Sequence, residues 1–92
     1  MRKRDFILLY LSKKTSRCAT LYEIAKEISE AFADEYKLRH DTPERASRAA
    51  TRDALIALHR LARAGVIRRT WEWKIIAKNK WQRVRYYCLK AV

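Results

Sequence analysis

Residues 43–64 begin at the single proline, Pro43, and end just before the single glycine, Gly65, of the 92-residue chain, and no helix-breaking residue lies between the two. Thr42 is a suitable N-cap, proline is favoured at the first helical position, and glycine commonly ends a helix. We therefore predict one helix about 33 Å long. Its apolar side chains are concentrated late, so we expect the C-terminal half to be anchored in the core and the N-terminal half to project as a basic rod.

After Gly65 the hydrophobic period changes to two, which predicts a β-hairpin. Asn79 suits the positive φ of a turn at residues 77–80, and a return strand should cover residues 81–89. The register of that strand stays open between two inward sets, Val84/Tyr86/Cys88 and Tyr87/Leu89. In the first strand the alternation favours core packing of the tryptophans over stacking on unpaired bases. The face expected to point inward comprises Ile67, Trp71, Trp73 and Ile75.

A first helix is predicted at about residues 2–11, where the side chains from Phe6 to Leu11 are apolar on every side. Such a helix needs burial on more than one face. We expect a homodimer formed through Phe6, Leu9 and Tyr10. The alternatives are a strand, or a helix buried within its own core.

The middle of the chain contains a second helix and a loop. A basic connector at residues 13–19, with a possible short strand at 17–19, leads to Thr20. Thr20 and Glu23 have the spacing of a capping box, and helical periodicity continues to about residue 33. Residues 34–41 are polar and poorly patterned, so we expect a loop there.

Basic residues are unevenly distributed along the chain. Residues 42–92 contain 13 Lys or Arg against 3 Asp or Glu, whereas residues 1–41 contain 9 against 7. Hydrophobic residues make up 49% of the chain, enough for a single folded domain over residues 1–92. A basic helix joined to a basic hairpin suits a polyanion with a groove and a backbone, such as duplex DNA.

Several other functions find no support in the residue pattern. The two histidines, His40 and His59, and the two cysteines, Cys18 and Cys88, have no zinc-ligand spacing, and no glycine-rich phosphate loop or catalytic triad is evident. We expect no enzyme activity, no metal and no cofactor. No stretch approaches the roughly 20 apolar residues of a membrane span, and the six-residue run from Phe6 is short for a signal peptide. We expect no membrane association and an intracellular protein, in the cytoplasm or, if viral, in the host cytoplasm.

The order of three helices and a hairpin, an α+β arrangement, resembles the winged helix-turn-helix DNA-binding proteins. The resemblance is carried by Leu58, Leu61, Ala64, Gly65, Val66, Ile67, Arg68 and Arg69, and by the closing strand at residues 85–89. Small size and basic charge look most like the compact regulators of archaea and their viruses. The presence of only one Asn and one Gln also suggests a thermophilic source. One departure is the long 34–41 segment, where the family has a tight turn.

This resemblance implies a double-stranded DNA-binding transcriptional regulator. The N-terminal part of the third helix would enter the major groove, and the hairpin wing would contact phosphates or the minor groove. The alternatives are a solvated helix face, wing lysines that deter sheet aggregation, and a structural or single-strand binder without sequence preference. The implied contacts are Arg45, Ser47, Arg48, Thr51 and Arg52 on the helix, and Arg68, Arg69, Lys78, Lys80 and Arg83 on the wing.

The same topology pairs a short strand after the first helix with the closing strand, which would bring Cys18 close to Cys88. An intrachain disulfide is therefore geometrically plausible, as is found in some intracellular proteins of hyperthermophiles. An intersubunit bond and two buried free thiols are the alternatives.

Overall fold

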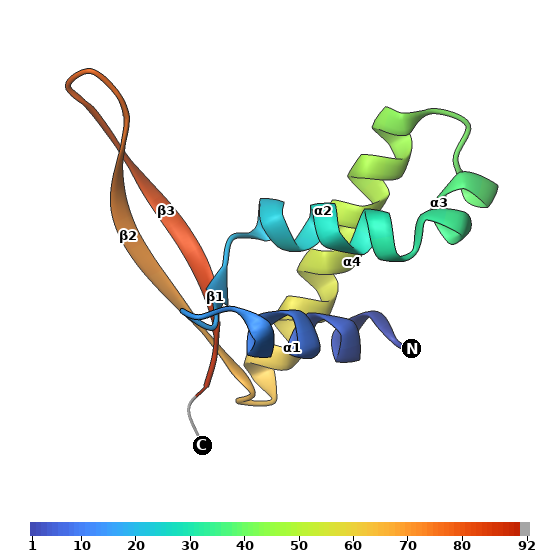
Figure 1. Cartoon of the computed structure of the whole chain (residues 1–92), viewed down its shortest axis with the longest axis horizontal. Coiled ribbons are helices and arrows are strands. Elements are labelled where there is room, and N and C mark those ends of the chain that lie inside the picture. The colour runs from blue at the N-terminus through green and yellow to red at the C-terminus, as the bar shows by residue number, and fades with distance from the viewer. Residues whose placement is uncertain (91–92) are drawn as a thin grey trace.

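Four helices and a three-stranded antiparallel sheet make up residues 1–90, the part of the chain that the computed structural model describes. The helices lie together on one side, and a long twisted hairpin extends past them (Figure 1). The α+β class is confirmed, but one more helix is present than we predicted. The elements are α1 (Lys3–Lys13), β1 (Cys18–Ala19), α2 (Leu21–Ala31), α3 (Ala33–Arg39), α4 (Pro43–Arg63), β2 (Ile67–Ala77) and β3 (Lys80–Leu89).

Helix α3 occupies the segment that we predicted to be a loop. It begins at Ala33, so α2 ends at Ala31, two residues before its predicted end. Its acidic residues lie in the first turn and its basic residues in the last, which complements the helix dipole. Tyr36 is buried, and its hydroxyl donates a 2.7 Å hydrogen bond to Asp53 of α4. The Lys3 ammonium lies 3.0 Å from Glu35 and 3.6 Å from Asp53, so it links α1 to both helices. These contacts come from residues distant in sequence, which is why local pattern did not reveal the helix.

The helix ends follow the expected signals. The side chains of Thr20 and Thr42 accept hydrogen bonds from the amides of Glu23 and Arg45, each at 3.2 Å. The Glu23 carboxylate accepts a 3.4 Å hydrogen bond from the Thr20 hydroxyl and also pairs with Lys14. At the end of α4, Gly65 has a φ of 78° and its amide donates to the carbonyl of Ala62, so the chain turns sharply into β2.

Strand β3 lies between β1 and β2, and its pairing resolves the register that the sequence left open. Ala19 pairs with Tyr87, and Ile67 pairs with Leu89. Residues paired directly share a face, so Tyr87 and Leu89 belong to the face that packs on the helices. The two-residue connection at Lys78 and Asn79 confirms the predicted turn, with a φ of 61° at Asn79.

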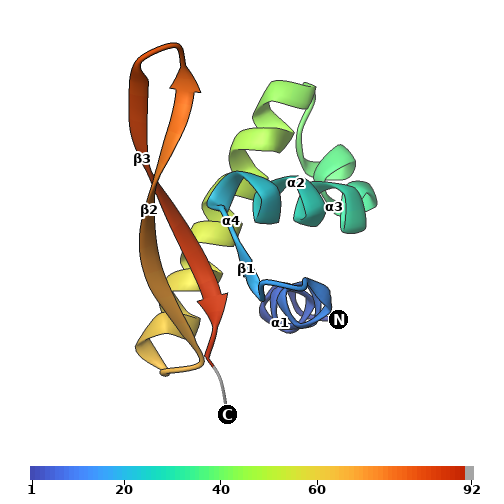
Figure 2. The same cartoon turned by 60° about the vertical axis from the view of Figure 1, so that its left-hand side comes forward.

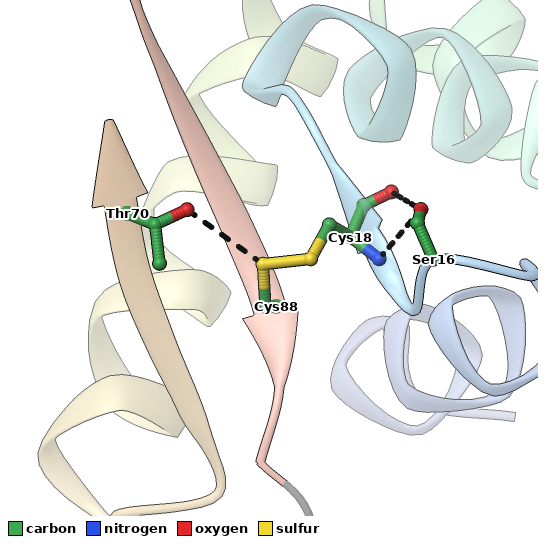
Figure 3. Close-up of a disulfide and its surroundings, with 4 residues drawn as sticks. All are labelled: Ser16, Cys18, Thr70 and Cys88. Carbon is green, nitrogen blue, oxygen red and sulfur yellow. Dashed lines mark hydrogen bonds between the residues drawn. A yellow bond between two sulfur atoms is a disulfide. The ribbon is translucent and has the colours of Figure 1, made fainter. Parts of the chain in front are cut away.

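A disulfide joins Cys18 of β1 to Cys88 of β3, which selects the intrachain bond from the three alternatives that the sequence left open (Figure 3). The two cysteines are directly paired in the sheet register, on the face away from the helical core. The Thr70 hydroxyl lies 3.8 Å from the Cys88 sulfur, and the Ser16 hydroxyl contacts the Cys18 backbone. Strand β1 has only two residues, so its backbone pairing with β3 is short. The disulfide adds a covalent link between the two strands.

The core lies between the helices and the base of the hairpin. Its fully buried large side chains are Tyr87, Ile7, Leu11, Ile24, Ile28 and Leu58. The N-terminal half of α4 is not the free-standing rod that we expected, because Ala49 and Ala50 are buried on one of its faces. Their small side chains allow close packing of this half of α4 against its neighbours α2 and α3. One face of the N-terminal half of α4 is thus covered by neighbouring helices, and the opposite face is exposed to solvent.

Candidate nucleic-acid interface

The exposed face of α4 presents the arginines that the sequence singled out. Arg45, Arg48 and Arg52 recur at intervals of three and four, and all three are exposed. Arg45 is partly engaged, since its guanidinium lies 3.2 Å from the Asp41 carboxylate. Arg48 and Arg52 form no ion pair within residues 1–90. Two cations one helical turn apart without a partner are mildly unfavourable in isolation and favour binding of an anion.

The hydroxyl residues of this face differ from each other. Ser47 is exposed, whereas Thr51 is half-buried and its hydroxyl donates a 2.9 Å hydrogen bond to the carbonyl of Ser47. The hydroxyl oxygen of Thr51 can still accept a hydrogen bond. Ser47 is therefore the freer of the two for contact with a ligand.

Basic side chains of the hairpin occupy three levels. Arg68 and Arg69 are exposed near the base on opposite faces, and Arg69 lines a shallow hollow with His59 and Arg63 of α4. Lys78 and Lys80 are exposed at the tip. Arg83 lies between base and tip, with its guanidinium carbon 4.0 Å from the Trp71 ring centroid. Cations thus run along the full length of the hairpin.

The N-terminal end of α4 and the tip of the hairpin project from the same side of the molecule (Figures 1 and 2). Helix α4 runs from this side toward the base of the hairpin, the chain reverses direction at Gly65, and β2 runs back toward the same side. The N-terminal end of α4, which contains Arg45 and Arg48, and the hairpin tip, with Lys78 and Lys80, therefore lie on one side, while Arg68 and Arg69 remain near the base. The arrangement can hold a rod-shaped polyanion at two separate places.

The prediction that Trp71 and Trp73 pack in the core is wrong. Trp71 is 44% exposed and Trp73 is 66% exposed, and Ile75 and Trp81 are exposed as well. Only Ile67 of the predicted inward face of β2 is buried. Strands β2 and β3 have 11 and 10 residues, and the helices cover only the base of the hairpin that they form. The signal that could have revealed this is the length of the strands relative to a core of this size.

The first helix is more deeply integrated than its sequence suggested. Phe6 is half-buried and makes an edge-on contact with Phe32, with ring centroids 5.7 Å apart. Tyr10 is half-buried, with the Lys14 ammonium 5.5 Å from its ring centroid. Of the three predicted dimer residues, Leu9 is the exposed one, at 43%.

Other kinds of site have little basis in the described part of the chain. Residues 1–90 contain no group of three or more His, Cys, Asp and Glu side chains that could hold a metal ion. No helix in this part combines the length and hydropathy needed to traverse a lipid bilayer. The basic surface on α4 and the hairpin is therefore the strongest candidate site.

Comparison with known proteins gives one informative likeness. No protein-family model matches the chain, and no curated protein matches it. Among solved structures, the chain is similar to Stf76 from the Sulfolobus islandicus plasmid-virus pSSVx, with a TM-score of 0.59 and 26% sequence identity. The likeness covers 100% of this chain and 86% of that one. The whole fold, hairpin included, thus has a counterpart in a protein of an archaeal mobile element.

Proposed function

We propose that this protein is a winged-helix transcriptional regulator that binds double-stranded DNA. The N-terminal half of α4 lies in the major groove, where Arg48 and Arg52 contact base edges. The hairpin is the wing, and Lys78 and Lys80 contact phosphates or the adjacent minor groove. The observation that carries the proposal is that the N-terminal end of α4, the half of the helix with the exposed arginines, and the hairpin tip project from the same side of the molecule.

The distribution of charge supports a division of labour between the two elements. Residues 42–64 contain 5 Lys or Arg against 2 Asp or Glu, and residues 65–92 contain 8 against 1. Phosphate contacts supply most of the salt-dependent affinity in protein–DNA complexes. The wing therefore contributes most of the affinity, and the sparser α4 arginines contribute the specificity.

The likeness to Stf76 supports the same context. Stf76 comes from a plasmid-virus of Sulfolobus islandicus. The disulfide and the scarcity of amide side chains of this chain fit a thermophilic source. We further propose a homodimer formed through α1, which would place two α4 helices on half-sites about one helical turn apart. Neither a metal nor a cofactor takes part, and no catalytic step is proposed.

The decisive experiment is selection of a binding sequence from a random duplex library, followed by competition. Binding to the selected duplex should survive a large excess of random duplex, because specific sites are typically about 10³-fold or more tighter. If random duplex displaces the selected one in proportion to its concentration, the protein is a binder without sequence preference. Loss of all binding near physiological salt would exclude both functions.

A further inference from the structure

The distal half of the hairpin carries an aromatic face that the proposed duplex contacts do not use. Trp71 pairs with Arg85, Trp73 with Arg83, and Ile75 with Trp81. Because directly paired residues of an antiparallel ladder share a face, all six side chains lie on one side of the hairpin. We call this set the tryptophan face: Trp71, Trp73, Ile75, Trp81, Arg83 and Arg85.

Folding does not explain the tryptophan face. Trp73 is 66% exposed, Ile75 64% and Trp81 60%, whereas Ile67 and Tyr87, further down the same face, are buried against the helices. Large aromatic side chains have about 150–250 Å² each to bury, so leaving them in water forgoes stability. Contiguous exposed apolar surface of this kind usually marks a binding site.

The charges on the tryptophan face define the chemistry of its partner. The guanidinium carbons of Arg83 and Arg85 lie 4.0 and 4.3 Å from the Trp71 ring centroid, which positions both cations on the face. The one acidic residue of the hairpin, Glu72, pairs with Val84 on the opposite face. The tryptophan face is therefore apolar and cationic, without a carboxylate.

A second copy of the chain is a poor occupant of this face. Two such faces would bring the paired arginines of each copy together, with no acidic side chain to compensate the repulsion. Paired duplex is also a poor occupant, because its bases are stacked on one another and present only their edges. An unpaired strand matches both properties of the face, because its exposed base rings can stack on the tryptophans and its phosphates can pair with the arginines.

We propose that the tryptophan face binds unpaired bases of single-stranded DNA, as a second binding surface beside the duplex site. Trp73 and Trp81, whose rings have no cation over them within residues 1–90, stack on bases. Trp71 positions Arg83 and Arg85 toward the phosphates. A duplex with an unpaired segment beside it would engage both surfaces, so the protein prefers such DNA to a fully paired duplex.

The test uses the protein's own fluorescence, because the chain has three tryptophans and all of them lie on this face. A single-stranded oligonucleotide is titrated into the full-length protein, in parallel with an abasic strand of the same length and charge. Stacking should quench the emission with the base-containing strand and not with the abasic strand. Substitution of Trp73→Ala should weaken single-strand binding by about tenfold, as expected for the loss of one stacked base.

A matched control is available on the opposite face of the same hairpin. Gln82 pairs with Lys74 and is exposed, so Gln82→Ala truncates a neighbouring side chain without touching the tryptophan face. It should leave single-strand binding unchanged. Trp73→Phe, which keeps a ring, should retain part of the affinity, and circular dichroism melting verifies that each variant folds.

Three results would overturn the proposal. Equal binding of the abasic strand would show that charge alone is recognised. An equal loss of duplex and single-strand affinity in Trp73→Ala would assign the face to the duplex contact. A concentration-dependent change in tryptophan emission without DNA would show that a second copy covers the face. Failure of the duplex proposal has a different signature, since selection would then yield no preferred sequence while single-strand quenching persists.

Discussion

The Tyr36 hydroxyl and the Asp53 carboxylate form a 2.7 Å hydrogen bond that joins α3 to α4. Asp53 also receives the Lys3 ammonium at 3.6 Å, so the same carboxylate connects three helices. The bond holds α3 against the half of α4 that carries the proposed base contacts. The position of those arginines relative to the wing thus depends on a helix that contributes no proposed DNA contact of its own.

Tyr36→Phe should therefore lower the free energy of unfolding by about 1–2 kcal/mol, since a hydrogen bond to a charged group is lost while the ring stays in place. Urea denaturation at neutral pH measures this change. Tyr22→Phe is the matched control, because Tyr22 is 79% exposed, and it should be neutral. A neutral Tyr36→Phe would show that the bond contributes nothing to the stability of the fold.

The same tyrosine should make stability depend on alkaline pH. Burial, then the hydrogen bond to Asp53, raises the pKa of Tyr36 above its usual value of 10.0. Above about pH 10 the unfolded chain releases this proton while the folded chain keeps it, so stability falls as pH rises, by at most about 1.4 kcal/mol per pH unit. In urea denaturation from about pH 8 to 11, the advantage of the wild type over Tyr36→Phe should shrink. A constant difference would contradict the raised pKa.

Removal of the disulfide should destabilise the protein strongly. Cys18 and Cys88 are 70 residues apart, and a loop of that length corresponds to about 4 kcal/mol of lost chain entropy in the unfolded state. For a domain of this size that lowers Tm by about 15–30 °C. Thermal melting of a Cys18→Ser/Cys88→Ser variant measures the change, and reduced wild type should melt at a similar temperature. A shift of only a few degrees would contradict the prediction.

Arg48→Ala and Lys78→Ala should weaken duplex binding in different ways. Arg48→Ala should relax base preference at one position, at a cost of about 1–3 kcal/mol on the preferred sequence. Lys78→Ala should weaken all duplexes alike and reduce the salt slope by about one unit. Titrations of selected and scrambled duplexes at several salt concentrations separate the two effects. If both substitutions behave alike, the assignment of base-reading and phosphate-binding roles is wrong.

Leu9→Lys should convert the proposed dimer to a monomer, because Leu9 is the exposed residue of the predicted α1 interface. Sedimentation equilibrium gives the oligomeric state. Leu38→Lys is the control, since Leu38 on α3 is 88% exposed outside that interface. A wild-type protein that sediments as a monomer, or a dimer that survives Leu9→Lys, would exclude dimerisation through this face of α1.

Local signals in the sequence predicted most of the elements and their ends. Thr20 and Thr42 cap helices, Gly65 ends α4, and Asn79 forms the turn, because each depends on neighbouring backbone alone. Helix α3 was missed because Tyr36 is stabilised there by Asp53, which lies 17 residues further along the chain.

The error in the hairpin has a different cause. Alternation correctly placed Trp71, Trp73 and Ile75 on one face of β2, but a period of two does not say how far the core extends along a strand. The basic residues of the candidate interface were therefore predictable from charge and spacing. The exposure of the tryptophan face could be recognised only from the positions of the helices, which cover the base of the hairpin and not its distal half.

The bond between Cys18 and Cys88 makes most of this protein a covalent ring. Helices α2, α3 and α4 and nearly all of the hairpin lie inside the ring, while α1 is a tail attached at Cys18. Opening of α1 therefore leaves the ring closed. In the proposed dimer, exchange of α1 between two copies would therefore leave α4 and the hairpin, which carry the proposed DNA contacts, covalently linked to one another within each chain.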